Sequence, residues 1–278
     1  NGINQILKTD IPFHKVDCTD LNEMKNIFET YEDIFACIHF AAYKSVGESV
    51  EKPEKYYKNN IGSTEVLLKC LEKNKFKNLI FSSSCTVYGM PDALPVNEDA
   101  PFKKAESPYG ETKQECEILI SKNLCNSISL RYFNPIGSHD SGLIGDCSSD
   151  NANNLVPIVT EVACGIRDKL IVNGNDYNTH DGTCVRDYIH VQDLAVAHVK
   201  ALDFLLDNKV KDVFNVGTGK GLSVLDIIYD FQEANGGENK CRHFSPRHLF
   251  PNALRLALTF FYLSSAPSPF FFVSPFCG

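Results

Sequence analysis

The feature that most restricts the fold of this chain is a regular alternation of short apolar runs with segments of helical length. Apolar runs are found at 11–17, 34–40, 78–83, 127–133, 185–190 and 213–216. Amphipathic segments long enough for helices lie at 20–31, 53–71, 109–123, 155–167, 193–206 and 223–234. This alternation predicts βαβ units and a parallel sheet. We therefore expect an α/β protein with a parallel sheet.

The amino-acid composition of the chain changes at residue 135. From there to 181, Gly, Asn, Asp and Ser are frequent, which indicates a smaller lobe placed over the sheet. We expect 1–134 and 182–206 to form the larger domain, and 135–181 with 207–235 to form the smaller lobe. Within the second lobe, the GTGKG run at 217–221 lacks the Walker spacing of a P-loop and predicts a tight turn.

The end of the chain has a different composition. Residues 256–278 carry no charge over 23 positions, a length that can span a bilayer. However, Pro267, Pro269 and Pro275 would break such a helix. We expect residues 236–278 to be a tail that belongs to neither domain, with a membrane anchor as the alternative.

Charge and cysteine content narrow the range of partners. The net charge of −8, without a Lys/Arg cluster, argues against nucleic acid and anionic membranes as partners. The 11 cysteines show no Cys-x-x-Cys pair and no metal-ligand spacing, so we expect reduced thiols in a cytoplasmic protein and no metal site. His39, His190 and His198 are isolated and predict structural roles.

Three side chains between residues 82 and 113 suit one chemical task. Tyr109 and Lys113 are four residues apart in a predicted helix, which places both on one face. A Lys ammonium beside a phenol favours the phenolate, so we expect a lowered Tyr109 pKa and a usable base. Ser84 ends a predicted strand, where hydroxyls face the ligand side of open α/β sheets. The alternative for the pair alone is an aromatic ring packed beside an extended Lys.

Seven stretches of sequence carry a family resemblance. They are IHFAAYKSVGESVEKPEKYYKNNIGST (38–64), NLIFSSSCTVYG (78–89), SPYGETK (107–113), LRYFNPIGSH (130–139), NNLVP (153–157), GNDYNTHDGTCVRDYIHVQDLA (174–195) and FNVGTGKGLSVL (214–225). Over roughly residues 11 to 230 the chain resembles the UDP-glucose 4-epimerase family of the extended short-chain dehydrogenase/reductase superfamily.

This resemblance implies a Rossmann-like, doubly wound parallel sheet with a smaller substrate-binding lobe. It also implies an NAD-dependent isomerase of galactose metabolism that interconverts UDP-glucose and UDP-galactose. Tyr109 would be the acid/base on the sugar 4-hydroxyl, Lys113 would tune it and bind the nicotinamide ribose, and Ser84 would hydrogen-bond the reacting oxygen. Hydride would leave C4 for NAD, the 4-keto sugar would turn, and hydride would return to its other face. A homodimer is implied by family analogy only.

The resemblance also implies two sets of binding residues. Besides the three catalytic residues, those along the cofactor would be Asp17, Cys18, Phe40, Ala41, Ala42, Lys44, Asn59 and Phe133. Besides Ser84, those along the substrate would be Cys85, Thr86, Asn134, Asn153, Asn154, Leu155 and Arg186. Local sequence alone leaves alternatives open: Arg186 could pair with Asp187, Asn134 and Asn154 could be turn residues, and Asn59 a surface position.

Three functions compete with the epimerase interpretation. Two are activities of related enzymes, and the third follows from a departure of this chain from the family pattern. A sugar-nucleotide dehydratase needs acidic residues after the strand-end hydroxyl, where this chain has Cys85 and Thr86, which argues against dehydration. A decarboxylase of the same superfamily remains an alternative. The third is a catalytically impaired or inactive fragment: no Gly-rich βα turn precedes Asp17 to hold the dinucleotide pyrophosphate, so we expect weak or absent NAD binding by the 278-residue chain.

Overall fold

The centre of the molecule is a parallel sheet of four strands. The computed structural model describes residues 2–31, 33–73, 77–146, 152–235 and 244–245. Within them, β1 (Cys37–His39), β2 (Asn78–Ser84), β3 (Asn126–Tyr132) and β7 (Lys211–Val216) lie in the order β1-β2-β3-β7. All neighbouring pairs are parallel. The predicted α/β class with a parallel sheet is confirmed.

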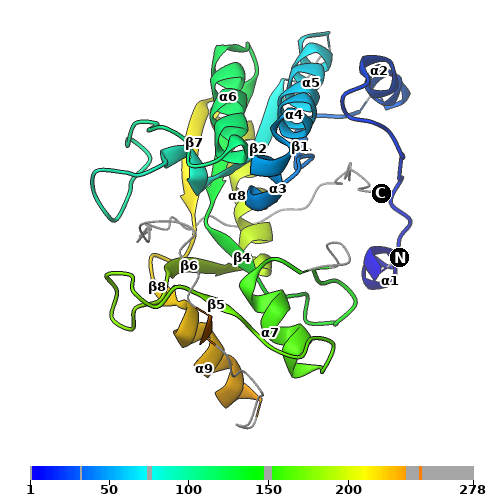
Figure 1. Cartoon of the computed structure of the whole chain (residues 1–278). Coiled ribbons are helices and arrows are strands. Elements are labelled where there is room, and N and C mark those ends of the chain that lie inside the picture. The colour runs from blue at the N-terminus through cyan, green and yellow to red at the C-terminus, as the bar shows by residue number, and fades with distance from the viewer. Residues whose placement is uncertain (1, 32, 74–76, 147–151, 236–243, 246–278) are drawn as a thin grey trace.

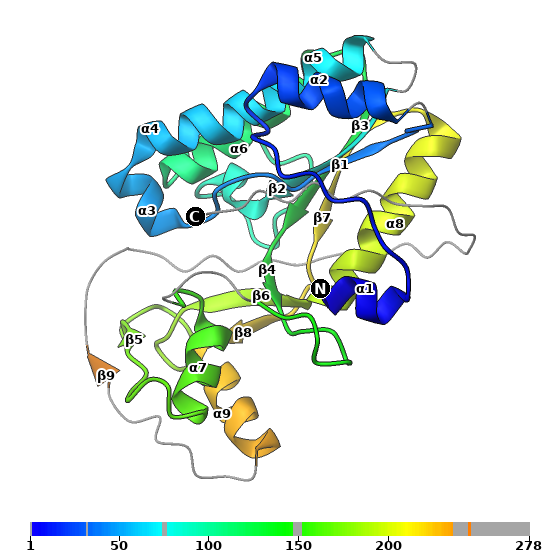
Figure 2. The same ribbon diagram turned by 90° about the vertical axis from the view of Figure 1, so that its right-hand side faces the viewer.

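Helices cover both faces of this sheet, as Figure 2 shows. On one face lie α2 (Leu21–Thr30), α5 (Gly62–Lys73) and α6 (Pro108–Lys122), and on the other α8 (Val191–Asn208). Strand β2 is apolar on both sides because its side chains alternate: Leu79 and Phe81 pack into the cluster with α5 and α6, and Ile80 into the cluster with α8. This explains the continuous apolar run at 79–81.

A chain of short helices leads into α5. It consists of α3 (Val46–Glu51), α4 (Pro53–Tyr56) and η1 (Tyr57–Ile61), a π-helical turn that continues into α5. Pro53 occupies the first turn of α4, where its missing N–H has no intrahelical acceptor to lose. The sequence predicted one helix from residue 53; the π-turn within it was not expected.

A smaller lobe lies at one end of the sheet (Figure 1). Its strands β4 (Asn134–Ile136), β6 (Val185–His190) and β8 (Gly221–Ser223) form a second sheet, with β6 between the other two. Helices α7 (Leu155–Ala163) and α9 (Val224–Ala234) pack together through Val159, Val162 and Ile228. Two-residue strands β5 (Val172–Asn173) and β9 (Phe244–Ser245) pair beside them.

The structure differs from the sequence predictions at three places. Residues 11–17 form no strand, because no described strand pairs with them. Strand β6, expected in the larger domain, lies in the smaller sheet beside β4, whereas β7, expected in the smaller lobe, pairs with β3 in the large sheet. Pairing between distant segments decides both placements. The predicted tail at 236–278 lies outside the described residues except for 244–245.

No helix in the described part of the chain has the length and apolar character needed to cross a membrane. The first described element is a short helix, α1 (Gly2–Leu7).

Candidate active site

The strand end of β2 and the first turn of α6 meet to form the site. Ser84 is the last residue of β2 and caps the 3-10 turn η2 (Cys85–Tyr88), accepting hydrogen bonds from the Thr86 backbone N–H at 3.3 Å and from Thr86 Oγ1 at 3.0 Å. Helix α6 begins after Ser107, whose hydroxyl accepts from the Gly110 N–H. Tyr109 therefore stands in the first helical turn, within hydrogen-bonding reach of Ser84.

Lys113 lies one turn further along α6 and is buried. Its Nζ donates a hydrogen bond of 2.6 Å to the Ser82 carbonyl, and it lies 4.9 Å from the Phe81 ring centroid and 5.9 Å from that of Tyr109. The three residues predicted to be catalytic thus come together from one helix and one strand. Burial of the ammonium lowers the pKa of Lys113 to about 8.

The predicted lowering of the Tyr109 pKa is wrong for this structure. Burial of the phenol raises the pKa of Tyr109 to about 12, and the hydrogen bond with Ser84 opposes this only in part. The reason is that the phenolate is penalised by the same burial that lowers the Lys113 pKa, while the ammonium is directed at Ser82. Lys113 lies beside Tyr109, as predicted, but burial and not the Lys113 charge decides the direction of the Tyr109 pKa shift.

The loop that carries predicted cofactor residues is fixed by Asn60. The buried Asn60 side chain accepts from the Tyr43 N–H at 2.8 Å and donates to the Tyr43 carbonyl at 3.1 Å and to Thr112 Oγ1 of α6 at 3.2 Å. Asn59 donates to Asn60 Oδ1 at 3.0 Å. Ala41, Ala42 and Lys44 lie on the loop held in this way. Lys44 is exposed and pairs with Asp146 at 3.9 Å.

Sequence reasoning singled out Asn59 and missed Asn60. An adjacent pair of asparagines inside a helix was the available signal, because buried polar side chains in helices need partners outside the helix. The π-helical turn places Asn60 so that its amide points at Tyr43 and Thr112.

Phe40 and Phe133 also lie near the strand ends. The exposed Phe40 ring is 4.9 Å from the ring of His198. Phe133, which follows β3, is buried against Val87 and Tyr88 of η2. Both positions agree with residues beside a ligand at this end of the sheet, and their roles stay predictions.

The isolated histidines make internal hydrogen bonds, in line with the structural roles predicted for them. His198 Nδ1 donates to the Leu194 carbonyl at 2.7 Å, so Nε2 accepts from Tyr132 Oη at 2.5 Å. His39 Nε2 lies 3.1 Å from Thr64 Oγ1. His190 caps α8 through Nδ1, which accepts from the Gln192 N–H.

Asp17 and Cys18 stand just before α2. The Asp17 carboxylate accepts from the Thr19 N–H at 2.8 Å and the Thr19 hydroxyl at 2.7 Å, and these bonds lower its pKa. Cys18 is buried in the core beneath α5, which raises its thiol pKa. Neither makes a described contact with Tyr109 or Lys113, so their proposed place along a cofactor rests on the resemblance.

Arg186 lies on β6 of the smaller lobe. Its Nη1 donates to the Val185 carbonyl at 2.8 Å, and no carboxylate pairs with it among the residues that the structure describes. Its charge lowers the pKa of Cys85, although burial wins and raises that pKa to about 12. The alternative pairing with Asp187 is not observed.

Asp187 instead holds the Gly-rich turn. Its buried carboxylate accepts from the Thr218 N–H at 2.7 Å, the Thr218 hydroxyl at 2.8 Å and the Gly219 N–H at 2.8 Å. A Cβ at Gly217 would lie 2.7 Å from the Phe133 ring and 2.8 Å from Asp187, so glycine is required there. The predicted tight turn is confirmed.

The remaining predicted substrate residues come from both lobes. Asn134 of β4 donates to the Asp187 carbonyl at 2.9 Å, which links it to the same turn. Asn153 and Asn154 are exposed before α7, and Asn154 precedes the helix without a side-chain capping bond. Leu155 packs in the α7–α9 cluster. Cys85 and Thr86 lie in η2, directly after Ser84.

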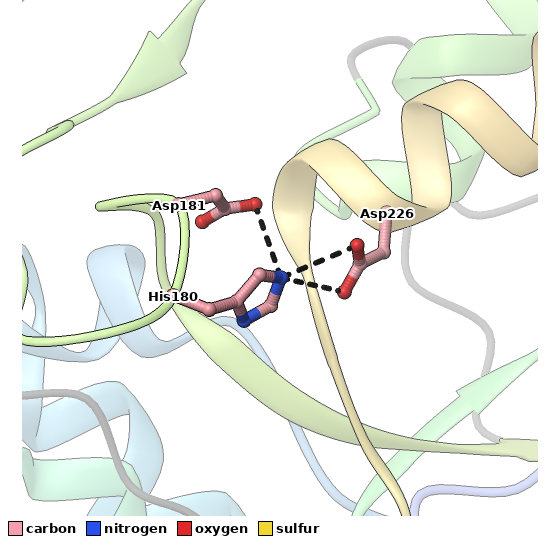
Figure 3. A group of neighbouring side chains, drawn as sticks. All are labelled: His180, Asp181 and Asp226. Carbon is pink, nitrogen blue, oxygen red and sulfur yellow. Dashed lines mark hydrogen bonds and ion pairs between the residues drawn. The ribbon is translucent and has the colours of Figure 1, made fainter.

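One His/Asp group lies in the smaller lobe. His180, Asp181 and Asp226 have ligand atoms within 4.8 Å of one another (Figure 3). Their oxygens already serve the fold: Asp181 accepts from Thr183 and Ser223, and Asp226 accepts from the Ser223 N–H. The group therefore ties a loop to the start of α9.

Comparisons with known proteins agree with this geometry. A profile of the NAD dependent epimerase/dehydratase family matches residues 1–217. The UDP-glucose 4-epimerase of Bacillus subtilis (strain 168) is 45% identical over 243 residues, which are 86% of this chain and 71% of that protein.

Solved structures give the same picture. A UDP-glucose 4-epimerase from Stenotrophomonas maltophila, crystallised with NAD and formylated UDP-arabinopyranose, matches with a TM-score of 0.84 at 42% identity, over 89% of this chain and 74% of that one. The enzyme from Bifidobacterium longum in complex with NAD+ and UDP matches with a TM-score of 0.81 at 41% identity, over 88% and 74%. The fold is therefore Rossmann-like.

Proposed function

The chain belongs to the NAD dependent epimerase/dehydratase family, and from this premise we propose that it catalyses the NAD-dependent interconversion of UDP-glucose and UDP-galactose. The observation that carries the proposal is the meeting of Tyr109 and Lys113 on α6 with Ser84 at the end of β2. The UDP-glucose 4-epimerase relatives support the substrate class.

The residues present suit the nicotinamide end of NAD. A buried Lys113 ammonium beside Tyr109, with the loop 41–44 held by Asn60, offers cationic and hydrogen-bonding groups at the strand ends. We propose that Phe40, Ala41, Ala42, Lys44, Asn59 and Phe133 line the same cofactor, with Asp17 and Cys18 toward its adenine. NAD held by these residues would serve as the acceptor, and then as the donor, of the hydride of sugar C4.

The protein's own task is to move one proton and to orient the sugar. Tyr109 takes the proton of the sugar 4-hydroxyl and later gives it back, and Ser84 hydrogen-bonds the same oxygen. Burial keeps the pKa of Tyr109 high in this structure, and the Lys113 ammonium, 5.9 Å from the ring centroid, is the group that would stabilise a phenolate. A neutral Cys85 and Thr86 beside Ser84 offer no acid/base pair for dehydration.

We propose that the smaller lobe binds the UDP part. Arg186 has no described carboxylate partner, and a guanidinium is well suited to a diphosphate. Asn134, Asn153, Asn154 and Leu155 would complete the contacts with UDP. In this division the larger lobe carries β1, β2, β3 and β7 with α8, and the smaller lobe carries β4, β6 and β8 with α7 and α9.

Cytoplasmic location and a homodimer are also proposed. The eight cysteines that the structure describes are all free, which suits a reducing compartment. The dimer rests on family analogy, and light scattering of the purified chain tests it.

The experiment that tests the function incubates the purified chain with UDP-galactose and NAD. We expect UDP-glucose to accumulate to an equilibrium mixture, detected by chromatography, with no change in product mass. Loss of water would identify a dehydratase, and loss of carbon dioxide from UDP-glucuronate would identify a decarboxylase. No conversion of UDP-galactose would overturn the proposal for this chain.

A further inference from the structure

A buried ion pair lies directly beneath the catalytic face of α6. Arg131 of β3 binds Glu117 of α6 through two hydrogen bonds, Nε to Oε1 at 3.0 Å and Nη2 to Oε2 at 2.7 Å, and both side chains are only 6% exposed. The Ser83 hydroxyl donates to the same carboxylate. Such bidentate pairs fix geometry as well as charge.

The partners of Glu117 come from two adjacent strands. Ser83 and Arg131 are paired in register on β2 and β3, so one carboxylate of α6 is bound to neighbouring strands at the same level. Arg131 also donates to Tyr88 Oη at 2.8 Å and to the Glu98 carbonyl at 3.2 Å. The guanidinium thus has partners for its buried charge, the condition under which a buried pair is tolerated.

Glu117 also shares its helix face with the proposed catalytic residues. Tyr109, Lys113 and Glu117 follow one another at intervals of four residues, the spacing that stacks side chains along one face. Ser83 directly precedes Ser84. Any rotation of α6 that displaced Glu117 from Arg131 would therefore also move Tyr109 relative to Ser84.

We propose that Glu117 is a positioning residue of the active site, which acts through Arg131 and Ser83 to fix the face of α6 that presents Tyr109 and Lys113 to the end of β2. This inference rests on the proposed epimerase function for its kinetic consequence. Its electrostatic consequence can be measured without substrate.

The electrostatic consequence concerns Lys113. The groups that face its ammonium are Tyr109, Cys116 and Glu117 on α6, Phe81 and the Ser82 carbonyl on β2, and His39 on β1. Burial lowers the pKa of Lys113, whereas Cys116 and the Glu117 carboxylate raise it. Of these side chains, Glu117 is the one charged carboxylate, so its neutralisation leaves the ammonium less stabilised.

The test compares Glu117→Gln with Glu115→Gln in the full chain. Glu115 is an exposed carboxylate two residues away, outside the described hydrogen bonds and ion pairs, and serves as the matched control. The pKa of Lys113 is followed by NMR of 13C-ε-lysine protein, with the resonance assigned by its loss in Lys113→Arg. We expect Glu117→Gln to lower that pKa and Glu115→Gln to leave it unchanged.

Kinetics provide the second readout. We expect Glu117→Gln to lower kcat for UDP-galactose about tenfold with KM unchanged, because Tyr109 is misplaced while UDP contacts remain. Equal Lys113 pKa values in the native and Glu117→Gln proteins, both folded by circular dichroism, would overturn the inference. Failure of the native chain to convert UDP-galactose would overturn the proposed function instead. The NMR measurement of the Lys113 pKa would then still decide the inference about Glu117.

A milder variant covers the case in which Glu117→Gln does not fold. Ser83→Ala removes one donor from the Glu117 carboxylate and no charge. We expect about threefold lower kcat at unchanged KM. Unchanged kcat in folded Ser83→Ala would contradict the positioning role.

Discussion

The ammonium of Lys113 donates a hydrogen bond of 2.6 Å to the backbone carbonyl of Ser82, which joins α6 to the strand that ends in Ser84. A side-chain cation is thereby anchored on a backbone atom of the neighbouring strand. Its position beside Tyr109 depends on the sheet and not on another mobile side chain.

Replacement of the Tyr109 hydroxyl should remove turnover without harming the fold. We expect Tyr109→Phe to lower kcat for UDP-galactose at least about 100-fold, the range for loss of a general acid/base. Tyr229→Phe is the control, because Tyr229 is exposed on α9. Steady-state kinetics and thermal melting check both variants. Near-full activity of Tyr109→Phe would disprove the acid/base assignment.

Arg186 should contribute to substrate binding more than to stability. We expect Arg186→Met to raise KM for UDP-galactose by about tenfold or more, because a charged hydrogen bond to the diphosphate is lost. The melting temperature should change little, since its described bond is to the adjacent Val185 carbonyl. Lys122→Met, which removes an exposed charge at the end of α6, should leave KM unchanged. An unaltered KM in Arg186→Met would place the diphosphate elsewhere.

Asn60 should stabilise the loop at Tyr43. We expect Asn60→Ala to reduce the free energy of unfolding by about 2 kcal/mol, because the Tyr43 N–H and the Thr112 hydroxyl lose a buried partner. Asn208→Ala removes a comparable bond at an exposed helix end and should cost less. Urea denaturation measures both, and hydrogen exchange at the Tyr43 amide should quicken only in Asn60→Ala. Equal exchange rates would show that the loop is held by other contacts.

His39 should make the protein less stable in acid. Burial lowers the pKa of His39 to about 3 from an ordinary value near 6.5, so between these values the unfolded chain binds more protons than the folded one. Stability should therefore fall as pH falls below about 6.5. From pH 7.5 to pH 5 the native protein should lose about 2 kcal/mol more than His39→Leu.

The difference between the two proteins isolates His39, because His198 also has a lowered pKa and acts in the same direction. Urea denaturation at both pH values provides the measurement. Parallel losses in the native protein and His39→Leu would mean that His39 is not the group responsible.

The sequence predicted the parts of the fold that depend on local pattern. The run at 78–83 is a buried strand because both of its faces are apolar, and Tyr109 and Lys113 share a helix face because of their spacing. Glu117 obeys the same spacing and could have been recognised from it. In each case, a periodicity of the chain is the physical cause.

The predictions that were wrong concern features that depend on contacts between residues distant in the sequence. The direction of the Tyr109 pKa is set by burial beneath other elements, which no four-residue spacing reveals. The sequence prediction assigned β6 and β7 to the wrong lobes, because the strands with which they pair, β4 and β3, are far away in the chain. Residues 11–17 have strand-like composition, but a strand also needs a neighbour.

Strand β2 ends in three consecutive serines that serve different partners. The Ser82 carbonyl receives Lys113, the Ser83 hydroxyl binds Glu117, and Ser84 faces Tyr109. Because the three residues are identical, deletion of any one of them leaves serine at the first two positions and brings Cys85 to the position of Ser84, on the face that Ser84 now occupies. The repeat should therefore tolerate no change of length during evolution, even where single replacements within it are accepted.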